Sequence, residues 1–482
     1  MSLDKPFLFI ILFIINKSLK KEISNEKLLF VWEHCRHGAR GSYKSFDYNN
    51  WVDIFSEKWK GTGELTPIGM RMHYLLGIST RKKYNNFLSN EYNPNEIFAL
   101  STNINRTLIS AYSNLQGIYN RQKNINLNEK QFKRISVQNK NYSRRINIYK
   151  LNEKLIEKNI KYFPVHIYNE KDLKYQLYSI NVCPGISQYI KNLRNSKGMK
   201  RMYNDVYKST NENFGNYILK FMNKSNGDIN FLYDFEEIKT ICDSFIADYF
   251  DGRKLEKIKN SGIDMEKFYN HCLNISLITS YFSYYGNPLE KTVEIGVSPT
   301  FREIFDYMEK RISLDKNGNP DKIISSSPRF VIVSTHDISL AGIDLFLESK
   351  FNIKFKRADY ASSQIFELWK NIKNGKYFIN YLINLEKVAT FDYNDFKNNV
   401  SSFLYSEKEI KKICFPDSIT KKSKYKNLKI FFYFTFILIF LLFFFILYLI
   451  YEKKTNKQLT IMKINKIIEM EQMSFVDKLK IY

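Results

Sequence analysis

The sequence predicts an α/β fold, interrupted by a mostly helical insertion and followed by one transmembrane helix. Three observations lead to this prediction. Short apolar segments alternate with helical patterns on both sides of the insertion, which is typical of α/β domains. Long stretches of residues 142–296 show helical spacing. Residues 430–451 carry no charge over 22 positions, and about 20 apolar residues are enough to cross a bilayer as a helix.

The first predicted strand covers residues 27–32 and leads into a cluster of basic side chains. Arg36, His37 and Arg40 follow it directly, and Gly38 allows a sharp turn there. Ligands of open α/β sheets bind at the carboxyl ends of strands, and guanidinium donors match phosphate oxygens. The neighbouring cations should lower the pKa of His37, so that its ring remains a neutral nucleophile in acid. This segment therefore predicts an anion site, with phosphate as its ligand.

Two helices are expected next in the chain, and a further basic residue lies at the start of the second one. Thr66 and Pro67 are typical of an N-cap and a first helical residue, and this helix should extend through Lys83. A short strand is expected over residues 97–100, and the next helix begins near Arg106. Free backbone N–H groups at a helix start also attract anions. Arg106 is therefore expected to join the anion site.

The insertion is predicted to contain one extended segment over residues 163–167 and then helices. The helical spacing is clearest over residues 186–202, 231–250 and 265–282. Aromatic stripes on such helices usually form a hydrophobic core, so we assign them no binding role.

In the final part of the α/β region, chemically active side chains again follow directly after a predicted strand. A helix over residues 300–311 precedes a strand over 329–334, and His336 and Asp337 follow that strand before a helix over 339–347. Asp337 is a candidate general acid, and His336 is a candidate donor to a phosphate oxygen. The alternative is that the pair only caps the helix, because Asp is a favoured cap residue.

Charge and composition exclude some classes of function. The 482-residue chain has a net charge of +25, but its lysines are spread along the whole length and form no known nucleic-acid-binding motif. We therefore expect no nucleic-acid partner. The six histidines and five cysteines form no HxxxH or CxxC arrangement, so we predict no metal and no cofactor.

The amino terminus resembles a signal peptide. The apolar segment over residues 7–15 follows Lys5 and has the length of a signal-peptide core, although a retained anchor or a first strand would also fit. Lysines on the two sides of the transmembrane segment do not orient it. A signal peptide would place residues 25–429 in the lumen or outside the cell. The expected topology is therefore a single-pass type I membrane protein with a cytosolic tail.

The cysteine count leaves one thiol unpaired. Of the five cysteines, Cys35 is the natural candidate for a buried free thiol, because it lies inside the strand-end motif. The other four allow three pairings, and the sequence alone does not choose among them. The Asn-x-Ser/Thr triplets give four glycosylation candidates: Asn141, Asn223, Asn274 and Asn399.

Four segments together resemble the histidine acid phosphatase family (histidine phosphatase branch 2), of the lysosomal and prostatic type. These are RHGAR at 36–40, GELTPIGM at 63–70, STNINRTLISAYSNL at 101–115 and STHDISLAG at 334–342. The resemblance extends from about residue 28 to residue 414. It implies a mixed sheet flanked by helices on both faces, with a smaller, mostly helical cap domain inserted.

The resemblance also implies the roles of individual residues. His37 would form a phosphohistidine, and Asp337 would protonate the leaving group. The phosphate oxygens would be bound by Arg36, Arg40, Arg106 and His336. Cys183 would pair with Cys414, whereas Cys242 would pair with Cys272 or stay reduced. Glu33, His34 and Cys35 depart from the apolar strand usual in relatives.

From these arguments we expect an acid phosphatase that hydrolyses small phosphate monoesters, anchored in a lysosomal, vacuolar or cell-surface membrane, and dimeric like its relatives. The alternatives are a phytase-like inositol-phosphate hydrolase and a non-catalytic phosphate-ligand receptor or adhesion module. The expected domains are a signal peptide (1–24), the first part of the α/β core (25–175), the helical cap (176–295), the second part of the core (296–415), a basic linker (416–429), the transmembrane helix (430–451) and the cytosolic tail (452–482).

Overall fold

The computed structural model divides the chain into two units, Met1–Cys414 and Phe415–Tyr482. The expected signal peptide lies outside the described residues. The structure describes residues 25–43, 63–121, 162–168, 183–221, 235–253, 255–285, 289–354 and 356–479.

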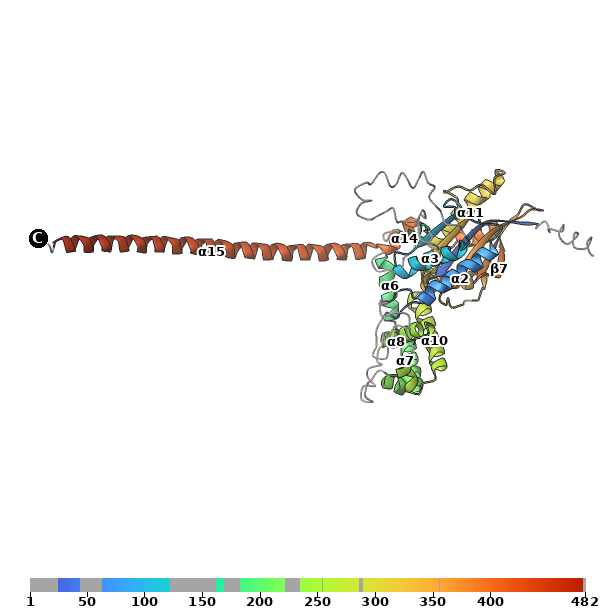
Figure 1. Cartoon of the computed structure of the whole chain (residues 1–482), viewed down its shortest axis with the longest axis horizontal. Coiled ribbons are helices and arrows are strands. Elements are labelled where there is room, and N and C mark those ends of the chain that lie inside the picture. Colours follow the sequence, from blue (N-terminus) through green and yellow to red (C-terminus); the bar gives the residue numbers. More distant parts are fainter. Residues whose placement is uncertain are drawn as a thin grey trace, which may run out of the picture. The chain divides into compact units, whose positions relative to one another are not determined.

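A mixed seven-stranded sheet forms the centre of the first unit in the part of the chain described (Figure 1). The strand order is β3-β2-β4-β1-β5-β6-β7. The four strands β3, β2, β4 and β1 are parallel to one another. Each of β5, β6 and β7 is antiparallel to the strand before it in this order. This confirms the predicted fold class. The strands are β1 Glu26–Arg36, β2 Ile97–Ser101, β3 His166–Ile167, β4 Phe330–Thr335, β5 Ser363–Asn371, β6 Tyr377–Ile383 and β7 Glu386–Asp392.

Strand β1 is longer than its apolar segment. Residues 33–35 were expected to follow the strand, but they continue it, because they pair with β4 on one side and β5 on the other. Glu33, His34 and Cys35 are each at most 3% exposed. The first motif thus begins inside the sheet, and its polar side chains are buried in the protein core.

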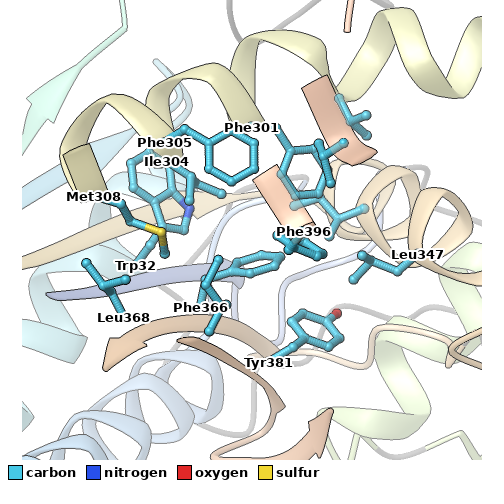
Figure 2. Close-up of a cluster of buried hydrophobic side chains, with 14 of the residues drawn as sticks. Trp32, Phe301, Ile304, Phe305, Met308, Leu347, Phe366, Leu368, Tyr381 and Phe396 are labelled. Atoms are coloured by element: carbon cyan, nitrogen blue, oxygen red, sulfur yellow. The ribbon is translucent and has the colours of Figure 1, made fainter. Parts of the chain in front are cut away.

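Helices cover both faces of the sheet. One face packs on α2 Pro67–Lys83 and α3 Asn105–Ile118, and the other packs on α11 Leu289–Lys316, α12 Asp337–Phe351 and α13 Tyr393–Ser401. Trp32 and Phe366 of the sheet meet Phe301 and Phe396 of these helices in an aromatic cluster (Figure 2). Helix α2 begins as predicted, since the Thr66 hydroxyl accepts the Gly69 N–H at 3.2 Å.

The insertion is helical, as predicted, and has its own core. Its helices are α6 Pro184–Arg194, α7 Lys197–Phe221, α8 Phe235–Phe250, α9 Glu256–Asn260 and α10 Met265–Tyr285. The segment expected as one helix over 186–202 is two helices, because the chain breaks near Ser196. We call these five helices the cap. Buried side chains of α8 and α10 pack on Ala39 and Tyr360 of the core region.

Two disulfides join parts of the first unit. Cys183 at the start of α6 is bonded to Cys414 at the end of α14 Glu407–Cys414, as the resemblance implies. Cys242 of α8 is bonded to Cys272 of α10, which answers the question left open by the sequence. Cys35 is a buried free thiol, as predicted.

The second unit is a long helix, α15 Asp417–Leu479. It runs without a break through the segments expected as linker, transmembrane segment and tail. Its part Phe432–Glu469 is long and apolar enough to cross a membrane, with a window of mean hydropathy 2.8 and no buried side chains.

Candidate active site

The two strand-end motifs lie next to each other because β1 and β4 are parallel neighbours. Arg36 pairs in register with Thr335, so His37 on one strand and His336 on the other leave the sheet side by side. The His37 N–H also donates to the Thr335 carbonyl at 2.9 Å. The centroids of the two imidazole rings are 5.5 Å apart.

His37 is buried and has a defined tautomer. Its Nδ1 lies 2.8 Å from the Gly38 carbonyl oxygen, which only accepts, so Nδ1 carries the proton and Nε2 has the free lone pair. Burial lowers the pKa of His37 well below its usual value, and the positive charges of Arg36, Arg106 and Arg40 lower it further. The ring is therefore neutral and nucleophilic in mild acid.

Gly38 allows the loop to approach helix α2. A Cβ atom at Gly38 would overlap the backbone of Gly69, so no larger residue fits without a shift of one of the two segments. The Gly38 N–H donates to the Ser110 hydroxyl of α3 at 3.1 Å. The loop after β1 is thus held by two helices.

Arg36 and Asp337 form a partly buried ion pair. Arg36 Nη2 is 2.8 Å from Asp337 Oδ2, and their side chains are 9% and 31% exposed. Burial alone would raise the pKa of Asp337, but the positive charges of Arg36 and Arg40 lower it below the usual value. Helix α12 begins at Asp337 rather than at the predicted Ser339, with His336 at the N-cap position, and the Asp337 carboxylate accepts the Ile338 N–H at 3.0 Å.

Arg40 is held by a carboxylate of the cap. Its Nη2 is 2.7 Å from Asp243 Oδ1 of α8, and its Nη1 donates to the Gly41 carbonyl at 3.1 Å. The guanidinium also lies 4.3 Å from the centre of the Tyr43 ring.

Arg106 and His336 are joined directly. Arg106 lies in the first turn of α3, as expected, and its Nη2 donates to His336 Nδ1 at 3.2 Å. Because Nδ1 accepts, the neutral ring carries its proton on Nε2, which donates to the Thr102 hydroxyl at 3.1 Å. The Thr102 hydroxyl in turn donates to Thr107 Oγ1, 2.7 Å away. Burial first, and then Arg106, lower the pKa of His336.

Buried polar side chains lie behind these residues. The carboxylate of Glu33 accepts from Asn114 Nδ2 at 3.3 Å, and burial raises its pKa to about 7. His34 contacts the Thr335 hydroxyl at 2.8 Å, and His73 Nε2 donates to the Arg36 carbonyl at 2.9 Å. Burial lowers the pKa of His34 to about 3 and that of His73 to about 4.

All six predicted site residues lie around one point of the structure. The charges of Arg36, Arg40 and Arg106 act on His37, the His336 ring lies beside it, and Asp337 is paired with Arg36. Asp243 and Thr102 also contact these residues, and neither was predicted from the sequence. Thr102 stands inside one of the quoted segments, whereas nothing in the sequence around Asp243 marks it.

The remaining predicted positions are not part of this cluster. Asn274 on α10 and Asn399 on α13 are exposed, whereas Asn141 and Asn223 lie outside the described residues. Among the described residues, no group of three or more His, Cys, Asp or Glu side chains is arranged to hold a metal ion.

Comparison of the sequence with known proteins gives a family match and matches to individual relatives. The family description of the histidine phosphatase superfamily (branch 2) matches residues 15–384. Human prostatic acid phosphatase is 37% identical over 120 residues, which cover 24% of this chain and 29% of that protein. Lysosomal acid phosphatase of Xenopus laevis is 39% identical over 97 residues, covering 20% of this chain and 22% of that protein. The matched segments thus span less than a third of these relatives.

Solved structures share the fold at low sequence identity. A Hafnia alvei phytase in complex with myo-inositol hexakis sulphate has a TM-score of 0.52 at 12% identity, covering 79% of this chain and 98% of that one. The phytase of Citrobacter braakii has a TM-score of 0.50 at 14% identity, with the same coverage. At such identity the likeness shows the fold alone.

Proposed function

Because the chain belongs to the histidine phosphatase superfamily (branch 2), we propose that it is an acid phosphatase that hydrolyses phosphate monoesters through a phosphohistidine. One observation carries the proposal. His37 is a buried, neutral imidazole with its lone pair on Nε2. Three guanidiniums act on it, and one of them is paired with the Asp337 carboxylate. A site that only binds phosphate requires neither a nucleophile nor a proton donor.

The first step transfers the phosphoryl group to His37. Nε2 attacks phosphorus, the bond from phosphorus to the ester oxygen breaks, and its electron pair stays on the leaving oxygen. Arg36, Arg40 and Arg106 neutralise the charge of the phosphoryl oxygens. The His336 Nε2–H, which donates to the Thr102 hydroxyl in the free site, donates to a phosphoryl oxygen instead. Such preorganised charges account for much of the acceleration in phosphoryl transfer.

Asp337 supplies the proton for the leaving oxygen. In the free site its pKa is lowered, chiefly by the ion pair with Arg36, so it is a carboxylate there. A phosphate dianion that takes Arg36 would remove this counter-charge and add a negative one nearby. Both changes raise the pKa of Asp337, so that it carries a proton in the complex.

The second step releases phosphate. A water molecule attacks the phosphohistidine and passes a proton to the Asp337 carboxylate. The bond from phosphorus to Nε2 breaks, and its electron pair returns to His37. The products are inorganic phosphate and a site with Asp337 protonated. That proton leaves with the phosphate, so Asp337 is a carboxylate again in the free site.

The proposal also covers the membrane that anchors the domain and the side on which the domain lies. The apolar part of α15 and the lysosomal acid phosphatases among the relatives support a type I protein of a lysosomal, vacuolar or surface membrane, with the catalytic domain on the luminal or outer side. Both disulfides agree with an oxidising compartment.

Turnover of 4-nitrophenyl phosphate in mild acid by the detergent-solubilised chain tests this function. His37→Ala should lower kcat at least about a thousandfold, since it removes the nucleophile. His166→Ala, which changes an exposed histidine of β3, should leave the rate unchanged. Phosphorus-labelled substrate, quenched in alkaline denaturant where phosphohistidine survives, should label the wild type and not His37→Ala. Equal, negligible rates for all three proteins would favour the phosphate-ligand receptor.

A further inference from the structure

The cap places a partly exposed carboxylate beside Arg40 of the proposed site. Asp243 of α8 is 2.7 Å from Arg40, and its side chain is 40% exposed, whereas that of Arg40 is 6% exposed. The ion pair therefore has a buried cation on the core side and an open anion on the cap side. A substrate group that extends from Arg40 toward solvent on this side would lie near this carboxylate.

The position of Asp243 is fixed by its neighbours in the sequence. Cys242 is bonded to Cys272 of α10, and Phe245 is fully buried in the cap core. Phe250, at the end of the same helix, packs edge-on against Tyr360 at 5.1 Å between ring centres. Tyr360 in turn lies under the Arg36 guanidinium at 4.4 Å. Helix α8 is thus attached both to the cap and to the site.

Two other acids, one in α8 and one directly after it, have a different partner. Asp248 and Asp251 are buried and pair with Arg253 at 3.5 and 3.3 Å. Among the described carboxylates of α8, Asp243 is the one that forms an ion pair with an arginine of the proposed phosphate site. Its negative charge is therefore the direct contribution of α8 to the electrostatics beside Arg40.

We propose that Asp243 determines specificity, so that the enzyme prefers monoesters of neutral or cationic alcohols and discriminates against substrates that carry further phosphates. This inference rests on the proposed phosphatase function and names its substrate class. A second phosphate at about 6 Å from the carboxylate would be repelled strongly enough to lower kcat/KM by about 3- to 100-fold, depending on the local dielectric. A cationic leaving group would be attracted instead.

Asp243→Asn keeps the shape and removes the charge. The assay uses the full chain in detergent and three substrates: 4-nitrophenyl phosphate, phosphocholine and myo-inositol hexakisphosphate. We expect the ratio of kcat/KM for the hexakisphosphate to that for 4-nitrophenyl phosphate to rise about tenfold in Asp243→Asn, and the corresponding ratio for phosphocholine to fall. Asp243→Glu, which restores the charge, should return both ratios toward those of the wild type.

A matched control separates a local effect from a general change in charge. Asp205→Asn removes the same charge from an exposed position of α7 in the cap, and it should leave both ratios within twofold of the wild type. Equal thermal unfolding curves would show that the variants are folded. Ratios that do not change in Asp243→Asn, or that change equally in Asp205→Asn, would overturn the inference while leaving the phosphatase function intact. Loss of all turnover in the wild type would overturn the proposed function itself.

Discussion

The core and the cap contribute to the site in different ways. The core provides His37, Arg36, Arg106 and His336 from segments next to strand ends, within short sequence motifs and largely buried. The cap provides Asp243 from within a helix, outside any motif and half open to solvent. The core residues explain how a phosphoryl group would be transferred. The cap residue bears on which molecule would bring that group to the site.

The largest effect is expected in the core, at Asp337. Asp337→Asn should lower kcat about a thousandfold for alkyl phosphates, since general acid catalysis contributes roughly 10²–10⁴-fold. The loss should be smaller for 4-nitrophenyl phosphate, whose leaving group needs less protonation. A series of leaving groups measures this dependence. An equal loss for all of them would mean that Asp337 acts only by holding Arg36.

The next effect is expected in the cap, at the Cys242–Cys272 disulfide. The double change Cys242→Ser and Cys272→Ser opens a loop with a sequence separation of 30, and such a bond stabilises a protein by about 3 to 4 kcal/mol in the chain-entropy view. Thermal unfolding should show the loss. The substrate ratios should shift in the same direction as in Asp243→Asn, because α8 is no longer fixed to α10.

Removal of the Cys183–Cys414 bond is the matched control for this change. That bond lies at the start of α6 and not beside Asp243. Its loss should lower stability without changing the substrate ratios. If both variants changed the ratios alike, the selectivity would depend on general cap stability rather than on Asp243.

A smaller effect is expected from Glu33 and concerns stability. Burial raises the pKa of Glu33 from 4.5 to about 7 in the folded protein, so the folded state keeps a proton that the unfolded state loses between these values. The free energy of unfolding should therefore fall as pH rises from about 4.5 to 7, by up to about 3 kcal/mol for this group. Glu33→Gln should lack this loss.

Urea unfolding at several pH values checks the Glu33 prediction. His34 and His73 have lowered pKa values, so their contribution is lost as pH falls below 6.5, which is the opposite direction. This contribution cancels in the difference between Glu33→Gln and the wild type. Glu212→Gln, at an exposed position of α7, should show the slope of the wild type. A difference that does not depend on pH would contradict the assignment.

Much of the core was predictable because local patterns determine it. The Thr66 cap, the strand before His336 and the first-turn position of Arg106 all follow from short-range chemistry. The length of β1 was not predictable, since Glu33 and His34 look like the end of a strand. They extend it only because β4 and β5 pair with the backbone on both sides.

The cap half of the site was not predictable for a similar reason. The ion pair between Arg40 and Asp243 joins positions 203 residues apart, and no spacing rule connects them. The same holds for Thr102 and His336, which are 234 residues apart. The partners of a predicted residue depend on tertiary packing, whereas its type and approximate place can be read from the sequence.

The bond between Cys183 and Cys414 also has a mechanical consequence. Cys414 is the last residue of the first unit, and the long helix begins three residues later. Tension applied to the chain from α15 therefore reaches a covalent branch point before it reaches any hydrogen bond of α14. The load passes into α6, the first helix of the cap, so that α14 resists being peeled away from the domain and the strand end that holds His37 is shielded from the pull.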